Sequence, residues 1–198
     1  MIIGCDIDGV LADFNSGFIR RTIQVTGRDL FPERPFDIPM WNYPEHYGYT
    51  SKEVTAVWKN IKLDTNFWAT LPAFEGTMEF LFALEQRQDE GDGIYFVTAR
   101  PGVEAKHQTE RWLRCHGFRN NPTVLISSAK GKCAEALDLD AYIDDRWENV
   151  VDVAGGDLMT SRTQAYLLVR PWNRNRNPER YGIREVTSVA EFLSGLVK

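Results

Sequence analysis

Short, unbroken runs of apolar residues alternate with stretches that have the apolar spacing of a helix. Buried parallel strands are typically read as continuous apolar runs, because both of their faces are covered. The alternation of such runs with helical stretches predicts a parallel sheet with helices on its faces, an α/β fold. The expected strands are Met1–Cys5, Ile94–Val97, Thr123–Ile126, Ala141–Ile143 and Ala165–Val169.

Helices are expected between and after these runs. Gly117 follows one of them directly, as a glycine that ends a helix does, and Gly155-Gly156 follows another. The apolar spacing in these stretches is close to the 3.6-residue period of a helix. The expected helices are Gly76–Gln88, Val103–His116, Lys132–Leu139, Trp147–Ala154 and Ser188–Val197.

Residues 14–75 depart from this alternation. Helices are expected at Phe18–Val25 and Ser51–Ile61, and the part between them is interrupted by prolines. Half of the 24 aromatic residues of the chain lie in this stretch. We interpret residues 15–75 as a small, mostly helical insertion, with residues 1–14 and 76–198 forming the core. Proline is frequent here at Pro32, Pro35, Pro39 and Pro44.

Composition narrows the classes of protein that the chain can represent. It has 198 residues, of which 43% are hydrophobic and 26% charged, values that suit one soluble globular domain with an insertion. The net charge of −5 argues against a protein that holds nucleic acid through a basic surface. No apolar run is long enough to span a membrane, and the first residues do not have the pattern of a signal peptide. Three widely spaced cysteines predict a reduced, cytoplasmic protein, at Cys5, Cys115 and Cys133.

Acidic residues follow two of the expected strands. Asp6 and Asp8 come directly after the first strand, and Asp144 and Asp145 end the fourth. Open parallel sheets bind their ligands at this edge. Carboxylates held so close together repel one another unless a cation or a shared proton compensates, and a hard divalent cation with oxygen ligands fits best. For Asp145, a helix N-cap is an equally good interpretation.

Two further strand-end residues complete a site for a phosphate group. Thr98 ends the second strand and offers a hydroxyl and a backbone N–H. A lysine, either Lys130 or Lys132, begins the helix that leads into the fourth strand. A hydroxyl and an ammonium group beside a metal site would bind phosphoryl oxygens. A solvated lysine and a threonine that only caps a helix are the plainer alternatives.

These motifs, in this order, resemble the four motifs of the haloacid dehalogenase (HAD) superfamily, from residue 2 to about 175. Within this superfamily, the residues in and around the motifs are most similar to those of the 5′(3′)-deoxyribonucleotidase (type C 5′-nucleotidase) group. The resemblance implies a Rossmann-like three-layer core with a cap inserted after the first strand. The matching phrases are Asp8-Gly9-Val10-Leu11-Ala12-Asp13-Phe14, Phe67-Trp68, Leu71-Pro72, Gly76, Ile143-Asp144-Asp145-Arg146, Glu148-Asn149 and Arg170-Pro171-Trp172-Asn173.

The resemblance also implies roles for the acidic residues. Asp6 would be the nucleophile that forms an aspartyl-phosphate, and Asp8 the acid and base that acts on the leaving oxygen and then on water. Mg²⁺ would be held by Asp6, Asp144, Asp145 and the backbone carbonyl of Asp8. Lys130 matches the third motif better than Lys132 does, although both remain candidates.

The implied substrate contacts lie partly in the core and partly in the insertion. Thr98, Ala99 and Lys130 would bind the phosphoryl group, and Arg100 would add a phosphate or substrate contact. In the insertion, Phe67 and Trp68 match the nucleotidase phrase and are candidates for stacking on a nucleobase. Phe18 is a further candidate, with core packing as the alternative for all three aromatics.

The resulting prediction is a Mg²⁺-dependent phosphomonoesterase that acts on (deoxy)ribonucleoside monophosphates. One alternative is a phosphatase for another small phosphoester, such as a phosphosugar. A second is a non-catalytic binding protein with the same fold. No nucleic acid or membrane partner is expected, and a homodimer is left open.

Overall fold

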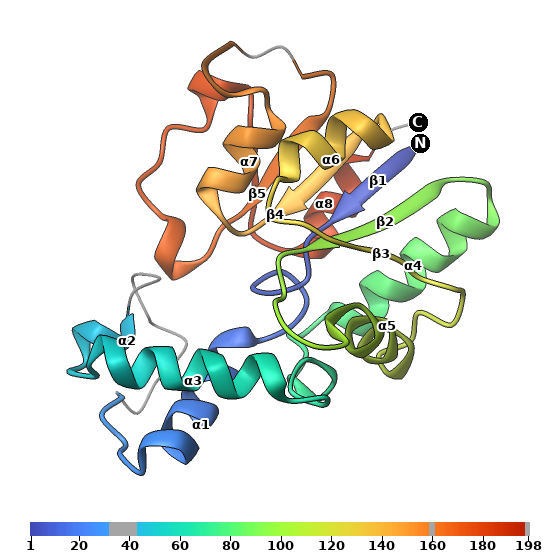
Figure 1. Ribbon diagram of the computed structural model, residues 1–198. Coiled ribbons are helices and arrows are strands. Elements are labelled where there is room, and N and C mark those ends of the chain that lie inside the picture. Colours follow the sequence, from blue (N-terminus) through green and yellow to red (C-terminus); the bar gives the residue numbers. More distant parts are fainter. Residues whose placement is uncertain (32–42, 159–160, 197–198) are drawn as a thin grey trace.

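The computed structural model describes residues 1–31, 43–158 and 161–196 (Figure 1). In this part of the chain the strands form one six-stranded sheet in the order β3-β2-β1-β4-β5-β6, and every pairing is parallel. The predicted α/β class with a parallel sheet is therefore confirmed. The strands are β1 (Ile2–Cys5), β2 (Gly93–Thr98), β3 (Thr123–Ile126), β4 (Ala141–Asp144), β5 (Gln164–Leu168) and β6 (Arg184–Val186).

Helices cover both faces of the sheet, which gives three layers. Apolar residues of α4, α5 and α8 pack in one buried cluster with Ile3, Cys5 and Phe96 of the sheet. Those of α6 and α7 pack in a second cluster with Val97 and Tyr142. Side chains alternate between the faces of a strand, so Phe96 and Val97 belong to opposite layers. The helices are α4 (Thr77–Asp89), α5 (Ala105–Cys115), α6 (Lys130–Leu137), α7 (Trp147–Val153) and α8 (Val189–Gly195).

Several elements differ from the sequence prediction. Helix α1 (Phe14–Thr26) begins before the expected Phe18, and α2 (Tyr43–His46) was not expected. Strand β6 was not expected, because Arg184-Glu185-Val186 is a half-polar edge strand that pairs only with β5 and has no continuous apolar run. Helix α6 begins at Lys130, two residues earlier than expected, and ends at Leu137 because Asp138 adopts a left-handed conformation. Leu139 lies in the loop before β4, fully buried.

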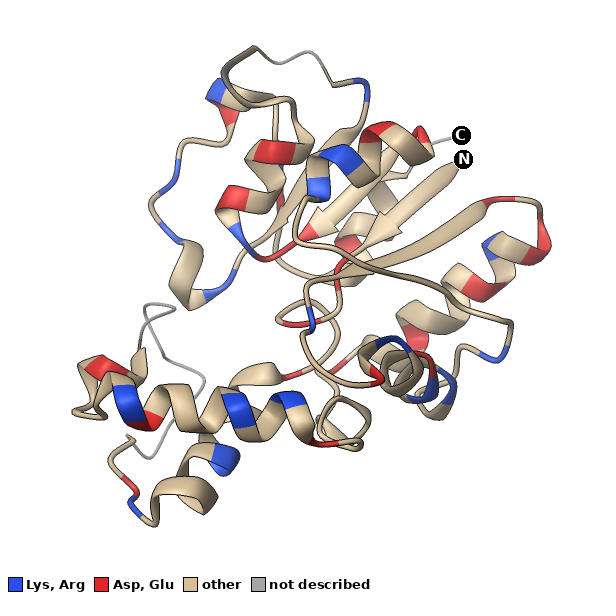
Figure 2. Cartoon of the chain, in the orientation of Figure 1, with Lys and Arg blue, Asp and Glu red and all other residues tan. Residues whose placement is uncertain are grey.

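The topology brings the acidic strand ends together. Strands β1 and β4 are neighbours, with Cys5 opposite Ile143, so Asp6 and Asp144 follow paired residues. The chain order reverses at this point of the sheet, where open α/β folds bind ligands. Figure 2 shows red acidic segments at the end of β4 and in the loop after β1.

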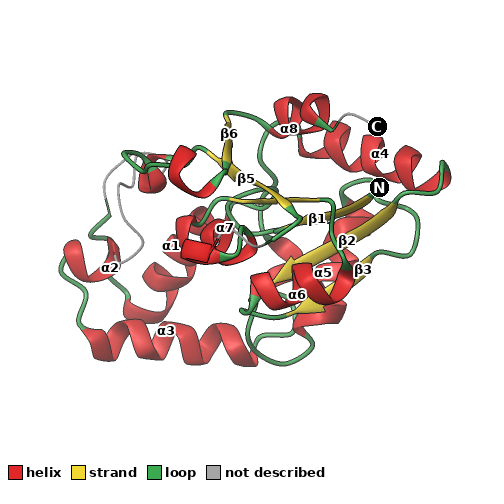
Figure 3. Cartoon of the chain, turned by 90° about the horizontal axis from the view of Figure 1, so that it is seen from above, coloured by secondary structure: helices red, strands yellow, loops and turns green. Residues whose placement is uncertain are grey.

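Helices α1 (Phe14–Thr26), α2 (Tyr43–His46) and α3 (Ser51–Leu63) lie together, apart from the sheet (Figures 1 and 3). Asp13 caps α1, because its carboxylate accepts a hydrogen bond from the backbone N–H of Ser16. Of the four prolines between α1 and α3, Pro44 lies in α2. The other three lie outside the described residues.

The chain enters and leaves the helical segment at adjacent points. Ala12 pairs with Ala73 in an antiparallel bridge, and the backbone N–H of Asp13 donates to the carbonyl of Pro72. Helix α4 then begins at Thr77. We propose that residues 15–75 act as a cap domain on the core formed by residues 1–14 and 76–198.

Core and cap segment also meet at Gly102. Gly102 has a φ of +105°, and a Cβ at this position would lie 2.5 Å from the backbone oxygen of Lys62. The next residue, Val103, donates its backbone N–H to that same oxygen. The end of α3 and the loop before α5 therefore approach as closely as their backbones allow.

Replacing Gly102 by alanine is expected to lower the free energy of unfolding by about 2 kcal/mol or more, because it adds backbone strain and a backbone clash. Gly91→Ala is the matched control, since Gly91 has a φ of +98° but no atom within 4 Å of the added Cβ. Urea unfolding of both variants measures the difference. Equal losses in the two variants would show that the Gly102–Lys62 approach is not a tight contact.

Candidate active site

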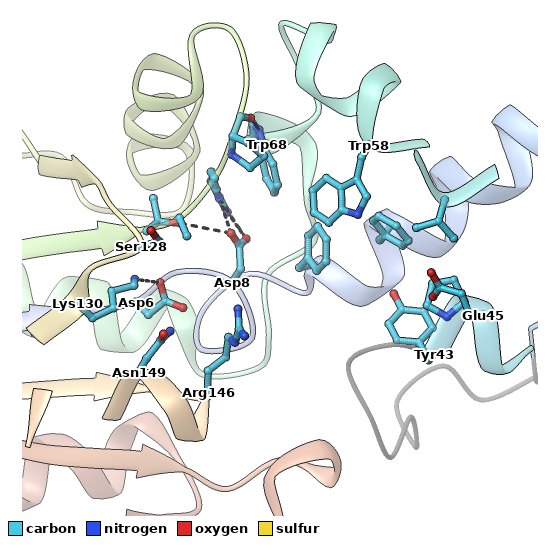
Figure 4. A pocket seen from close by; sticks show the side chains of 18 residues that line it. Asp6, Asp8, Tyr43, Glu45, Trp58, Trp68, Ser128, Lys130, Arg146 and Asn149 are labelled. Carbon is cyan, nitrogen blue, oxygen red and sulfur yellow. Dashed lines mark hydrogen bonds and ion pairs between the residues drawn. The ribbon is translucent and has the colours of Figure 1, made fainter. Parts of the chain in front are cut away.

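Lys130 and Asp6 form the centre of the site. The Nζ of Lys130 lies 2.7 Å from Oδ1 of Asp6 and 3.8 Å from Oδ2 of Asp144, and it also donates to the carbonyl of Val97 (Figure 4). Lys130 is 1% exposed. The two carboxylates raise its pKa against the opposing effect of burial, so the side chain stays charged. The structure thus places Lys130 in the site. Lys132, the other candidate, lies two residues further along α6 and is not among the residues that line the cavity.

Three carboxylates gather beside this lysine. One oxygen from each of Asp6, Asp144 and Asp145 lies within 4.8 Å of the others, and all three residues are buried. Burial raises the pKa of Asp6 to about 7; Lys130 opposes this shift, and Asp144 and Asp8 add to it. Burial, followed by the negative charges of Asp144 and Asp6, raises the pKa of Asp145.

These three residues fit a divalent cation. The charge of one lysine does not balance three buried carboxylates. Among the described residues, Oδ1 of Asp145 is buried without a hydrogen-bond partner, a costly arrangement that a metal ion would satisfy. Carboxylate oxygens are the ligands that Mg²⁺ prefers.

Asp144 is held in place by several donors. Its carboxylate accepts hydrogen bonds from the hydroxyl of Tyr142 at 2.9 Å and the backbone N–H of Arg146 at 2.8 Å. The amide of Asn149 donates to both oxygens at 3.1 and 3.0 Å. Such outer contacts orient a ligand before the metal arrives. Tyr142 and Asn149 were not predicted as site residues.

Asp145 is held by residues that follow strand β5. The indole Nε1 of Trp172 donates to its Oδ2 at 2.7 Å, and the amide of Asn173 donates to its backbone carbonyl at 2.7 Å. Gly9 has a φ of +83°, and a Cβ there would lie 2.2 Å from Oδ2 of Asp145. Asp145 does not cap α7, since Arg146 occupies the N-cap position.

Asp8 points away from the carboxylate cluster. Its carboxylate accepts hydrogen bonds from Arg100, at 2.8 Å for the shortest, and one from the hydroxyl of Thr98 at 3.4 Å. The Asp8 side chain is therefore not one of the three clustered carboxylates. Metal binding through its backbone carbonyl stays a prediction.

A cavity of about 630 Å³ joins two chemically different ends. Figure 4 shows Asp6 and Lys130 at one end, Tyr43, Glu45 and Trp58 at the other, and Asp8 between them. The cavity is lined by Asp6, Asp8, Phe14, Phe18, Tyr43, Pro44, Glu45, Val54, Trp58, Trp68, Thr98, Ala99, Arg100, Pro101, Ser128, Lys130, Arg146 and Asn149.

The substrate residues expected from sequence divide into two groups. Phe18, Trp68, Thr98, Ala99 and Arg100 line the cavity. Phe67 does not: it is 4% exposed and packs edge-on against Trp68, with the guanidinium of Arg21 over its ring.

Phe14 and Trp58 are not among the substrate residues expected from sequence. Both pack in the main apolar cluster and also line the cavity. Trp58 is half-buried on α3 and lies 5.8 Å from the ring of Phe14, in a stacked arrangement. The concentration of aromatic residues in this segment was the available signal. It could not separate the rings that face the cavity from those behind them.

A family model described as 5′ nucleotidase, deoxy (Pyrimidine), cytosolic type C protein matches residues 1–177. The chain belongs to this family. A "Putative 5′(3′)-deoxyribonucleotidase" of Chlorobaculum tepidum is 29% identical over 170 residues, which cover 81% of this chain and 77% of that protein. Together with the HAD-type fold described next, this makes the chain a phosphomonoester hydrolase of the HAD superfamily.

Solved structures of HAD hydrolases share the fold. A HAD family hydrolase from Deinococcus radiodurans, with bound phosphate and sodium, has a TM-score of 0.60 at 16% identity and covers 98% of this chain and 94% of its own. The "putative HAD-hydrolase YfnB" from Bacillus subtilis, bound to magnesium, has a TM-score of 0.60 at 16% identity and covers 100% and 98%. In the described part of this type C nucleotidase family member, no helix combines the length and apolar character needed to cross a membrane.

Magnesium is expected to stabilise the protein more at pH 8 than at pH 5. Because the folded-state pKa of Asp6 is raised to about 7, the folded protein binds more protons than the unfolded chain from about pH 4 upward. The stability of the metal-free protein therefore falls as pH rises toward 7, and Mg²⁺ replaces the lost protons.

Thermal unfolding with and without Mg²⁺ at the two pH values measures this effect. Asp144→Asn, which removes one carboxylate of the cluster, is expected to abolish most of the increase in Tm at pH 8. An equal increase at both pH values, or one that persists in Asp144→Asn, would contradict a metal site at these residues.

Proposed function

We propose that this protein is a cytoplasmic, Mg²⁺-dependent nucleotidase that hydrolyses nucleoside monophosphates, deoxyribonucleotides among them, through an aspartyl-phosphate. The observation that carries the proposal is the cavity, which joins the buried Asp6–Lys130 pair to a wall of aromatic side chains. A nucleotide has two parts that match these ends: an anionic phosphate for the charged end and a flat base for the aromatic wall. The family match and the Chlorobaculum tepidum relative support the same substrate class.

The charged end suits transfer of a phosphoryl group to Asp6. Lys130 is fixed beside the nucleophilic carboxylate and, with Thr98, binds the phosphoryl oxygens. A Mg²⁺ ion held by Asp6, Asp144 and Asp145 would offset the repulsion between this carboxylate and the anionic substrate. Attack by a carboxylate divides one difficult displacement into two easier steps.

Asp8 supplies acid and base catalysis in the proposed sequence. Its carboxyl group donates a proton to the ester oxygen as the P–O bond breaks and Asp6 takes the phosphoryl group. The resulting Asp8 carboxylate then accepts a proton from the water that attacks the aspartyl-phosphate, which releases phosphate and restores both residues. Its side chain is 18% exposed and lies between the two ends of the cavity, where the ester oxygen would be.

The aromatic end suits a nucleobase. Phe14, Phe18, Tyr43, Trp58 and Trp68 all contribute to the cavity wall. Every nucleobase has a π-face that stacks on such rings, so this wall accepts a base without distinguishing which one.

Release of phosphate from a panel of nucleoside monophosphates tests the proposed function. We expect turnover that requires Mg²⁺ and that falls to background in Asp6→Asn, which keeps the shape of the side chain but removes the nucleophilic charge. Hydrolysis of phosphosugars with higher kcat/KM than any nucleotide would contradict the substrate class. Full activity in Asp6→Asn would contradict the covalent step.

Trp58→Ala is expected to raise KM for nucleotides about tenfold, which corresponds to the loss of one base–aromatic stack. KM for ribose 5-phosphate, which has no base, should not change. Trp147→Ala is a suitable control, because Trp147 packs on Tyr181 and is not among the cavity residues. Equal increases for ribose 5-phosphate and nucleotides would show that Trp58 does not bind the base.

A further inference from the structure

The guanidinium of Arg100 donates hydrogen bonds to the carboxylate of Asp8. Nε lies 3.1 and 2.9 Å from the two carboxylate oxygens, and Nη2 lies 2.8 Å from Oδ1. The Arg100 side chain is 0% exposed, whereas that of Asp8 is 18% exposed and lies toward the cavity. Two parallel N–H to oxygen contacts fix both the position and the plane of a carboxylate.

The remaining contacts of Arg100 lock it in place. Nη1 donates to the hydroxyl of Thr109 at 3.1 Å, and that hydroxyl donates to the carbonyl of Ala105 at 2.7 Å. The guanidinium carbon lies 5.1 Å from the ring centre of Trp68 and 5.9 Å from that of Trp112. All three guanidinium nitrogens therefore have partners within the protein. The structure shows a contact of Arg100 with Asp8, and the sequence prediction that Arg100 contacts the phosphate or substrate stays a prediction.

The contact with Trp68 extends this arrangement to the cavity wall. The indole Nε1 of Trp68 donates to the carbonyl of Pro101 at 3.0 Å, and its backbone N–H donates to Oε1 of Gln108 at 2.9 Å. Trp68 is thus fixed to the loop and helix that carry Arg100 and Thr109. One buried cation contacts both an aromatic wall residue and Asp8.

We propose that Arg100 is a positioning residue that orients the carboxyl group of Asp8 toward the leaving oxygen. This rests on the proposed role of Asp8 as the general acid. A lysine can reproduce the function only in part, because it is a point charge without the planar pair of donors. The effect of Arg100 is therefore greatest where the leaving group must receive a proton.

Leaving-group dependence separates positioning from a purely structural role. An alkyl leaving group, as in a nucleoside monophosphate or glycerol phosphate, needs the proton from Asp8, whereas p-nitrophenolate leaves without one. Arg100→Met is expected to lower kcat/KM about 100-fold for the alkyl esters and less than about fivefold for p-nitrophenyl phosphate. Because kcat/KM ends at release of the leaving group, later activation of water by Asp8 does not enter the comparison.

The control variant is Arg21→Met, which also removes an arginine that pairs with an aspartate and lies over an aromatic ring. Arg21 lies over the ring of Phe67 at 5.2 Å and 2.6 Å from Asp64, away from Asp8. We expect the ratio of alkyl to aryl kcat/KM to be unchanged in Arg21→Met, strongly reduced in Arg100→Met and intermediate in Arg100→Lys. If Arg100→Met does not fold, Arg100→Lys gives the decisive ratio.

A double-mutant cycle tests whether Arg100 acts through Asp8. In an Asp8→Asn background, Arg100→Met should cause no further loss with the alkyl esters, because the positioned acid is already absent. Equal losses for alkyl and aryl esters, or additive losses in the cycle, would overturn the proposal. If glycerol phosphate is hydrolysed and nucleotides are not, the nucleotide substrate is wrong while the alkyl–aryl comparison still decides the role of Arg100.

Discussion

Three buried carboxylates beside one lysine are the constraint on which the site depends. Asp6, Asp144 and Asp145 meet because β1 and β4 are paired and both end at the same edge of the sheet. Their mutual repulsion is unfavourable in a buried environment, and the single charge of Lys130 offsets only part of it. The surrounding fold holds the three carboxylates together, and a bound cation would offset their repulsion.

Much of the nearby chain serves to hold these groups in position. Asn149 and Tyr142 donate to Asp144, and Trp172 donates to Asp145. Arg170 donates to the backbone carbonyls of Gly9 and Val10, which fixes the loop that carries Asp8. The loop that carries Asp8 and the side chain of Asp145 are therefore held by donors from a distant part of the sequence. Asp144, at the end of β4, is held by its near neighbours in the chain.

The sequence was sufficient to predict the features that depend on local pattern. Five strands have continuous apolar runs. Asp6, Asp144 and Thr98 could be placed because parallel strand ends share one edge, and Lys130 begins the helix that leads into β4. Features that depend on tertiary packing could not be predicted. Strand β6 is half-polar, and the apolar pattern is the same for Phe67 behind the cavity wall and Trp58 facing it.

The contact of the Arg100 side chain with Asp8 could not be predicted for the same reason, since the two residues lie 92 positions apart in the chain. Transfer of the phosphoryl group to Asp6 is tested most directly by acid quench during turnover, followed by peptide mass spectrometry. One phosphoryl group is expected on the peptide that contains Asp6, and none in Asp6→Asn. A phosphoryl group on any other residue, or none during turnover, would contradict this transfer.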